Sequence, residues 1–197
     1  NPYLVEAPWV LIDNISKNPS GMPAMLYGSK PTDGGHFFLT DVEKDFLLSK
    51  EPQAEPFVRK FLGAKEFLNN TNRWVLWLAD AAPNELAACP MVRERIRAVA
   101  EFRAESKAKS TRDYAYPTLF RQVTQPKSDY ILVPIHTSER REYIPFGYEG
   151  EKVIVGNSCF SISGATSGDF GLLQSKMHMA WVKTVSGRLK SDYRYSK

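Results

Sequence analysis

The sequence predicts an α+β fold: an irregular mixed α/β arrangement in which a mixed sheet of short strands is flanked by several helices. Its 197 residues can bury a sizeable core and correspond to one domain or two small ones. A composition of 43% hydrophobic and 24% charged residues is ordinary for a globular protein. Strand-like and helix-like segments are mixed along the chain without a regular βαβ alternation, which favours this class.

The chain is expected to begin with a strand and a loop. Residues 3–12 are rich in β-branched and aromatic side chains and predict a strand, which Pro8 confines to a sheet edge because proline lacks an N–H. Residues 28–35 are dense in Gly, Pro and Asp and therefore predict a loop.

Two short helices are predicted next. Thr40, followed by Glu43 three residues later, forms a capping box that opens a helix through Ser49. Residues 52–62 predict a second short helix, which Gly63 closes.

A buried strand and a long helix follow. Residues 73–79 predict the strand, and Pro83 and Pro90 stand at positions typical of the first residue of a helix. One apolar stripe marks the long helix after Pro90: Val92, Ile96, Val99 and Phe102. The opposite face carries both signs of charge: Arg93, Arg95, Arg97, Arg103, Lys107, Lys109 and Arg112, with Glu94, Glu101 and Glu105. A solvated helix face and a phosphate-contacting face both fit this mixture.

The last third predicts three strands and a helix. The strands are expected at residues 130–135, 153–155 and 159–162, and the helix at residues 170–185, ended by Gly187. One side of this helix collects Leu173, Met177, Ala180, Trp181 and Thr184.

Positive charge gathers at the C-terminal end. The net charge of the chain is +4, whereas its last 22 residues hold six basic side chains against Asp192 alone, a net of +5. This segment is either a surface that binds a polyanion or a solvated terminus.

Motifs of several enzyme classes are absent. The sequence contains no GxGxxG, GxxxxGK[ST], HExxH or GxSxG, and its three histidines are too scattered to predict a metal site or a catalytic triad. Cys89 and Cys159 fit reduced, buried thiols better than a disulfide or a metal site. No signal peptide or run of about 20 apolar residues is present, so we expect a cytoplasmic protein. The missing initiator Met indicates a fragment of a longer polypeptide.

The tail at residues 187–196 is a candidate for reading DNA bases. In an extended segment, Lys190, Asp192 and Arg194 would share one face, because side chains alternate along a strand. Lys or Arg donates to guanine O6 and N7, and Asp accepts from cytosine N4, so this face suits a G·C pair. A surface ion pair between Lys190 and Asp192 is the alternative explanation.

Ten segments in collinear order, from the first residue nearly to the last, resemble the target-recognition region of MmeI-like DNA methyltransferases. They are NPYLV (1–5), GSKPTDGG (28–35), KEPQA (50–54), RWVLW (73–77), PTLF (117–120), SERR (138–141), YIP (143–145), GNS (156–158), HMAW (178–181) and GRLKSDYRYS (187–196). Each alone means little, but together they are highly specific.

This resemblance implies the function and assigns roles to residues. It implies that residues 1–197 form a DNA target-recognition domain of a bacterial restriction–modification protein, which methylates adenine N6 with S-adenosylmethionine. The residues implied to read bases are Lys190, Asp192, Arg194, Asn157 and Ser158, with Glu139 as a further base contact. The residues implied to contact the DNA backbone are Arg188, Tyr193, Ser29, Lys30, Arg140 and Arg141. The alternatives are a purely structural turn for Ser29 and Lys30, and a role in local folding for residues 139–141.

The resemblance also implies what this chain lacks. The catalytic Asn-Pro-Pro-Tyr loop and the glycine motif for S-adenosylmethionine are absent from these residues, so the expected partners are double-stranded DNA and a methyltransferase domain of the same polypeptide. We therefore expect this chain itself to be non-catalytic and to hold no cofactor or metal. A protein-interaction domain that docks its basic tail on an acidic partner is the alternative function.

Overall fold

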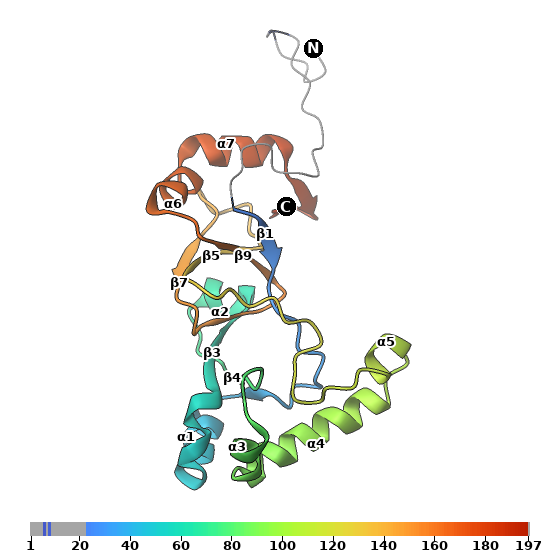
Figure 1. The fold of residues 1–197 in the computed structure, drawn as a ribbon. Coiled ribbons are helices and arrows are strands. Elements are labelled where there is room, and N and C mark those ends of the chain that lie inside the picture. Colours follow the sequence, from blue (N-terminus) through green and yellow to red (C-terminus); the bar gives the residue numbers. More distant parts are fainter. Residues whose placement is uncertain (1–5, 7, 9–22, 197) are drawn as a thin grey trace.

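The computed structural model describes residues 6, 8 and 23–196. Residues 23–196 form two lobes stacked along one long axis (Figure 1). Helices and three small sheets of short strands are mixed in both lobes, which confirms the predicted α+β class. The strand predicted at residues 3–12 lies outside the described residues, apart from residues 6 and 8.

The lower lobe is built around a four-stranded sheet. Its strand order is β2 (Phe38–Leu39), β4 (Trp74–Leu76), β3 (Val58–Leu62) and β8 (Ile154–Val155). The lobe also contains the helices α1 (Asp41–Lys50), α2 (Ala64–Asn69), α3 (Pro83–Ala87), α4 (Pro90–Ala104) and α5 (Lys109–Arg112), and the 3₁₀ helix Pro52–Phe57. Leu47, Val75 and Val92 lie in the apolar core of this lobe.

The upper lobe contains the other two sheets. One has the order β1 (Met25–Tyr27), β9 (Cys159–Ser163), β5 (Tyr130–Pro134) and β7 (Gly147–Glu149). The other has the order β10 (Gly187–Leu189), β11 (Asp192–Arg194) and β6 (His136–Thr137). The helices α6 (Ser167–Leu173) and α7 (Lys176–Val185) cover the top of this lobe (Figure 1). Its core includes Ile131, Phe160 and Val182.

The two lobes are joined by β8, which returns from the upper lobe to pair in parallel with β3. Phe61 lies opposite Ile154, and Leu62 opposite Val155. Gly156, directly after β8, lies so close to the Phe61 ring that a Cβ atom would collide with it. A small third core at this junction includes Leu62, Tyr130 and Val155.

The local helix signals are confirmed. The Thr40 hydroxyl accepts from the Glu43 N–H at 3.2 Å, and the Glu43 carboxylate accepts from the Thr40 N–H at 2.9 Å, which makes the predicted capping box before α1. Pro83 and Pro90 begin α3 and α4. Val92 and Val99 are buried as expected, whereas Phe102 is 42% exposed.

The helix predicted at residues 52–62 is wrong. Only residues 52–57 are helical, in a 3₁₀ turn, and Val58–Leu62 form β3 between two other strands. Gly63 does not close a helix but precedes α2, where its N–H donates to the Glu66 carboxylate at 3.1 Å.

The helix predicted at residues 170–185 is two helices. The Ser175 hydroxyl accepts from the His178 N–H at 3.1 Å and starts α7 anew. The buried side of α7 carries Met179 and Val182, whereas Met177 is 78% exposed, so the predicted apolar side was wrong. Gly187 begins β10.

Two further expectations concern the cysteines and the membrane. Cys89 and Cys159 are both free and buried, as predicted. Among the described helices, none has the length and apolar character needed to cross a lipid bilayer.

Candidate nucleic-acid interface

The C-terminal tail folds into a β-hairpin. β10 and β11 pair antiparallel, with Leu189 opposite Asp192, so the chain reverses within the two residues Lys190 and Ser191. Lys190 has a φ of 56°, as the first central residue of some two-residue hairpin turns does. The prediction of one extended face was therefore wrong: Lys190 lies at the tip, and Asp192 and Arg194 share one side of β11.

The hairpin is held by Tyr193 and Arg188. Tyr193 is only 5% exposed and packs in the core of the upper lobe, so it positions the hairpin, and its predicted role as a phosphate ligand is wrong. The Arg188 guanidinium lies 3.9 Å from the centre of the Tyr193 ring and donates to the Ser191 carbonyl at 2.9 Å. Arg188 thus braces the turn that presents Lys190.

Strand β6 brings a second predicted segment beside the hairpin. His136 pairs with Arg194 across the two strands, and the Glu139 N–H donates to the Asp192 carboxylate at 3.3 Å. The side chains of residues 139–141 are exposed. Sequence reasoning had no signal for the pairing of His136 with Arg194, because nothing in either segment specifies the other.

The Asn157–Ser158 turn is connected to the hairpin through one residue. The Ile135 N–H donates to the Ser158 carbonyl at 3.1 Å, and the Ile135 carbonyl accepts from the Tyr195 N–H at 2.8 Å. The Ser158 hydroxyl also accepts from the Ala64 N–H at 2.8 Å, which fixes the turn against the start of α2. Both residues of the turn are exposed, and both line a cleft of about 500 Å³.

Of the two residues predicted in the loop at 28–35, one is accessible. Ser29 is 0% exposed, its hydroxyl accepts from the Thr124 N–H at 3.0 Å, and its N–H donates to the Val155 carbonyl. Its side chain cannot reach a phosphate, so that prediction is wrong. Lys30 is exposed and follows the bridge between Ser29 and Gly156, which places it beside the Asn157–Ser158 turn.

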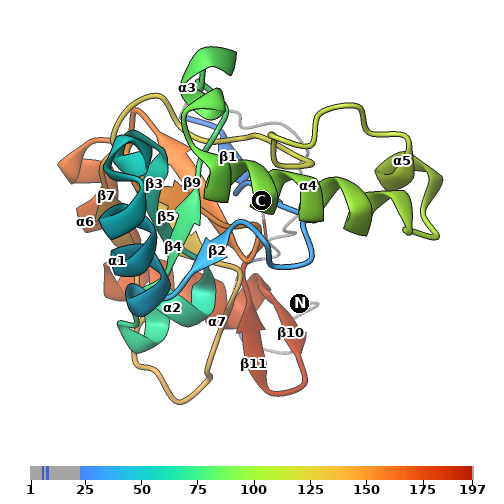
Figure 2. The same ribbon diagram turned by 90° about the horizontal axis from the view of Figure 1, so that it is seen from below.

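The accessible predicted residues thus follow one another along a single connected path. It runs from Lys30 through Asn157 and Ser158 to Ile135, and from there to β6, residues 139–141 and the hairpin. Figure 2 shows the hairpin projecting at the edge of the molecule beside α7. We name this set the reading surface: Lys30, Glu139, Arg140, Arg141, Asn157, Ser158, Lys190, Asp192 and Arg194.

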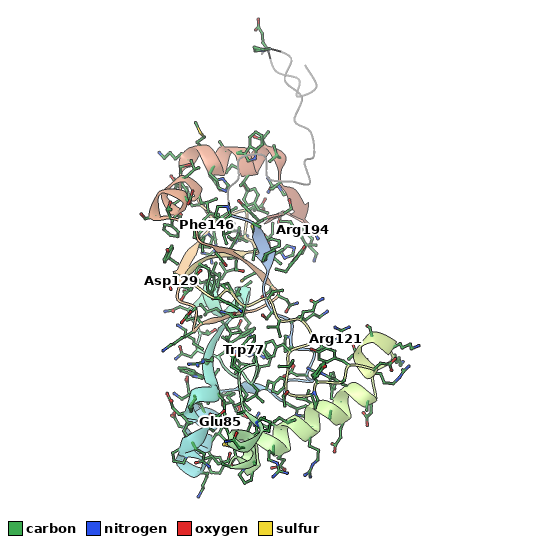
Figure 3. All side chains as sticks on the ribbon, in the orientation of Figure 1. Trp77, Glu85, Arg121, Asp129, Phe146 and Arg194 are labelled. Carbon is green, nitrogen blue, oxygen red and sulfur yellow. The ribbon has the colours of Figure 1, made fainter. Side chains whose placement is uncertain are left out.

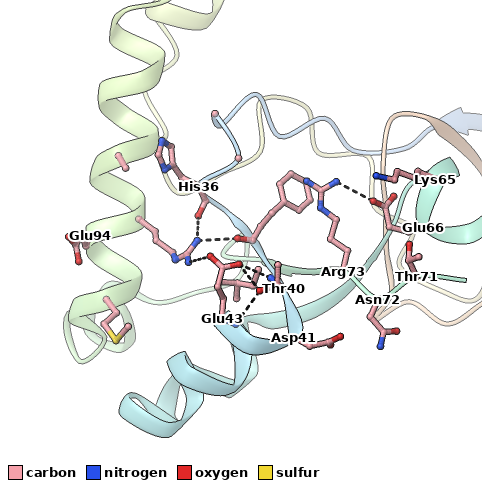
Figure 4. Close-up of a pocket in the computed structure, with 17 residues that line it drawn as sticks. His36, Thr40, Asp41, Glu43, Lys65, Glu66, Thr71, Asn72, Arg73 and Glu94 are labelled. Carbon is pink, nitrogen blue, oxygen red and sulfur yellow. Dashed lines mark hydrogen bonds and ion pairs between the residues drawn. The ribbon is translucent and has the colours of Figure 1, made fainter. Parts of the chain in front are cut away.

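A large pocket of the described residues lies elsewhere. It has a volume of about 1030 Å³, opens between α1, α4 and the start of α2, and contains no residue of the reading surface (Figure 4). Two ion pairs lie in it: Arg95 bonds the Glu43 carboxylate at 3.1 Å, and Arg73 bonds the Glu66 carboxylate at 3.2 Å. Its lining holds four carboxylates against three Lys or Arg side chains, so its charge does not favour a polyanion.

The described residues contain no cluster of three or more His, Cys, Asp or Glu side chains that could hold a metal ion. His178 packs against Phe146 and Tyr195, and its Nε2 atom lies 3.2 Å from the Tyr195 hydroxyl. Burial lowers the pKa of His178 and raises that of Tyr195 to about 12. His178 therefore joins α7 to the end of the hairpin as a neutral ring.

We expect the protein to lose stability as the pH falls below about 6.5. In the unfolded chain His178 takes up a proton near that pH, whereas the folded chain resists protonation, so the free energy of unfolding decreases. One proton contributes at most about 1.4 kcal/mol per pH unit, and the partial exposure of the ring makes the loss smaller. Urea unfolding at pH 7.5 and 5.5 checks this. His178→Gln should reduce the loss, and a loss in this variant equal to that of the wild type would contradict the prediction.

Comparisons with known proteins show which family the fold belongs to. The family described as "MmeI, target recognition domain" matches residues 6–197. DNA methyltransferase A of Bacillus subtilis (strain 168) is 38% identical over 197 residues, which are 100% of this chain and 22% of that protein. A solved structure, described as that of the Type IIL restriction-modification enzyme MmeI in complex with DNA, superposes with a TM-score of 0.90 at 44% identity. That match covers 99% of this chain and 26% of the other, so the chain spans about a quarter of each relative.

Proposed function

Because this chain belongs to the family of MmeI target recognition domains, we propose that it recognises a specific DNA sequence for a methyltransferase that modifies adenine N6. Residues 1–197 act in this proposal as one recognition domain of a longer polypeptide. The single observation that carries it is the reading surface, which gathers exposed donors and acceptors, together with the half-buried Asp192, from four separate segments.

The hairpin has a form suited to the major groove of DNA. That groove admits a two-stranded β-ribbon, and there each base pair presents a distinct pattern of donors and acceptors. Lys190 at the tip would donate to guanine O6 and N7, and Asp192 would accept from cytosine N4, so the pair would read one G·C pair. Arg194, Asn157 and Ser158 are the other proposed base contacts, with Glu139 beside them.

Backbone contacts would supply affinity independent of sequence. Lys30, Arg140 and Arg141 are exposed cations on the reading surface. The Arg188 guanidinium already bonds the Ser191 carbonyl and lies over the Tyr193 ring, so it would contact a phosphate from this position. Such contacts fix the register of a protein on the duplex, and the base contacts then select the sequence.

Catalysis and the cofactor belong to another part of the proposed polypeptide. S-adenosylmethionine would be bound by the methyltransferase domain, and the residues of this chain would contribute contacts to DNA. Because adenine must leave the duplex to be methylated, these contacts would also hold the DNA while the base is flipped. The function implies a location in the bacterial cytoplasm, where the DNA is.

The full-length protein, incubated with methyl-labelled S-adenosylmethionine and duplex DNA, is expected to transfer the label to adenine N6 within one short sequence. Nucleoside analysis of digested DNA identifies the modified base, and competition with random duplex measures the preference. Binding should weaken log-linearly with salt, as phosphate contacts require. Label on another base would refute the adenine assignment. Binding to an acidic protein, with no preference among duplexes, would instead favour the alternative function of a protein-interaction domain.

A further inference from the structure

The segment after α4 forms a second basic surface, outside the reading surface. Residues 105–121 hold Lys107, Lys109, Arg112 and Arg121 against two acidic side chains. Lys107 and Lys109 are exposed, and within residues 23–196 no carboxylate lies within ion-pair distance of either lysine. On α4 itself, by contrast, Glu94 and Glu101 stand among the arginines. We name residues 107–112, which contain α5 and these two lysines, the arm.

Two arginines fix the arm. The Arg112 guanidinium donates to the Ser106 carbonyl at 3.1 Å and closes the corner between α4 and α5. The Arg121 guanidinium donates to the Ser110 carbonyl at 3.0 Å, which ties α5 to the strand-like stretch at residues 121–122. The two lysines make no such bonds, so their ammonium groups are available to a ligand.

The same stretch connects the arm to the reading surface. The Arg121 N–H donates to the Pro31 carbonyl at 3.1 Å, and Lys30 and Gln122 exchange backbone hydrogen bonds of 3.0 and 3.1 Å. Lys30, on the reading surface, is thus joined to the arm by direct backbone contacts. A ligand bound at Lys30 would therefore lie next to a segment that leads directly to the arm.

Viewed from below, the arm and the hairpin project in different directions: α5 extends toward the right of Figure 2, and β10 and β11 extend toward its bottom edge. In Figure 1, α5 extends from the lower lobe toward the side on which β10 and β11 leave the upper lobe, whereas α1 and β7 lie opposite. Arg121 and Arg194 both lie on that side in Figure 3. The two therefore share a side in one view only, and the arm is related to the reading surface by its backbone connection to the Lys30 segment.

We propose that Lys107 and Lys109 contact the sugar–phosphate backbone of DNA that flanks the recognised sequence. This rests on the proposed function and extends it, because the arm would lengthen the bound stretch beyond the bases that are read. Ammonium groups on flexible side chains suit phosphates, which carry no sequence information. The arm therefore adds affinity and leaves the choice of sequence unchanged.

The test compares two double-lysine variants of the full-length protein. Lys107→Ala with Lys109→Ala removes the arm charges, and Lys50→Ala with Lys152→Ala removes two exposed charges that belong neither to the arm nor to the reading surface. Fluorescence anisotropy gives the Kd for a duplex that holds only the site and for one extended on both sides, over a series of salt concentrations. The slope of log K against log salt changes by about 1 for each lost phosphate contact.

In the arm variant, the magnitude of this slope on the long duplex is expected to decrease by about 2, and the affinity for that duplex to decrease roughly tenfold. This variant should lose little on the short duplex, and its preference for the site over random DNA should stay the same. Slopes equal to those of the control variant would overturn the proposal, and so would weaker binding with an unchanged slope. A wild-type protein that binds no duplex would overturn the proposed function as well.

Discussion

Lys190→Glu combined with Asp192→Arg in the full-length protein is expected to reverse the base pair preferred at one position of the DNA site. Lys190 lies at the hairpin tip, and Asp192 begins the strand that follows. Exchanging donor and acceptor would exchange guanine for cytosine on the strand that each contacts. A good base contact is worth about 1–3 kcal/mol, so the preference between the two sites should change by a factor of roughly 5 to 150 in each direction.

Methylation of a randomised duplex library, followed by sequencing of the modified molecules, measures this change. The matched control is Asp45→Arg with Lys50→Glu, which exchanges two exposed charges on α1, on the opposite side of the molecule (Figure 1). Lys190 is exposed, and Asp192 is half-buried with its carboxylate near the surface segment at Glu139, from whose N–H it accepts at 3.3 Å, so we expect the fold to persist. An active double variant with the original site preference would remove Lys190 and Asp192 from the base-reading residues.

Signals within one turn of chain were the most predictable part of the fold. The capping box at Thr40 and Glu43, and the prolines that begin α3 and α4, depend on atoms three or four residues apart. Such contacts are written in consecutive residues and need no knowledge of the rest of the chain.

Long-range pairing was much less predictable. Residues 58–62 form a strand because β4 and the distant β8 lie on either side, and neither partner is visible in the segment itself. The C-terminal hairpin was missed for another reason. Its turn places Lys190 at positive φ, where glycine is the usual signal, so the sequence there gives no sign of a reversal.

The candidate site was predictable in residue type but not in exposure. Lys30, Asn157 and Lys190 are accessible as expected. Ser29 and Tyr193 are buried, because the first bridges two backbone segments and the second anchors the hairpin. Both belong to segments that the family resemblance marks, and a resemblance does not separate residues that contact a ligand from residues that position them.

Arg103 illustrates the same difficulty and has the largest expected effect on stability. The helical pattern placed it on the charged face of α4, yet it is only 2% exposed. Its guanidinium donates to four carbonyls at 2.8–3.0 Å, those of Pro31, Thr32, Tyr116 and Leu119. Burial lowers its pKa, but neighbouring Tyr114 and Asp33 favour the charged form. Arg103 therefore holds two segments against α4, namely the loop at residues 31–32 beside Lys30 and the stretch at residues 116–119 that follows the arm.

We expect Arg103→Ala to lower the free energy of unfolding by about 3–5 kcal/mol, because four buried acceptors lose a charged donor at once. The free energy of unfolding of Arg103→Lys should lie between those of Arg103→Ala and the wild type, since an ammonium group cannot reproduce the planar fork of donors. Denaturant unfolding measures both. The control is Arg97→Ala, an exposed position on the same helix, which should change stability by less than about 0.5 kcal/mol.

The loss should extend to DNA binding, because Arg103 fixes both segments that connect the reading surface to the arm. In conditions where Arg103→Lys is still folded, its affinity for the extended duplex should fall more than its affinity for the short one. The Lys30 loop and the arm would then no longer be held in register with the hairpin. An Arg103→Ala protein destabilised by less than about 1 kcal/mol would show that the four carbonyls find other donors, and that the loop does not depend on this arginine.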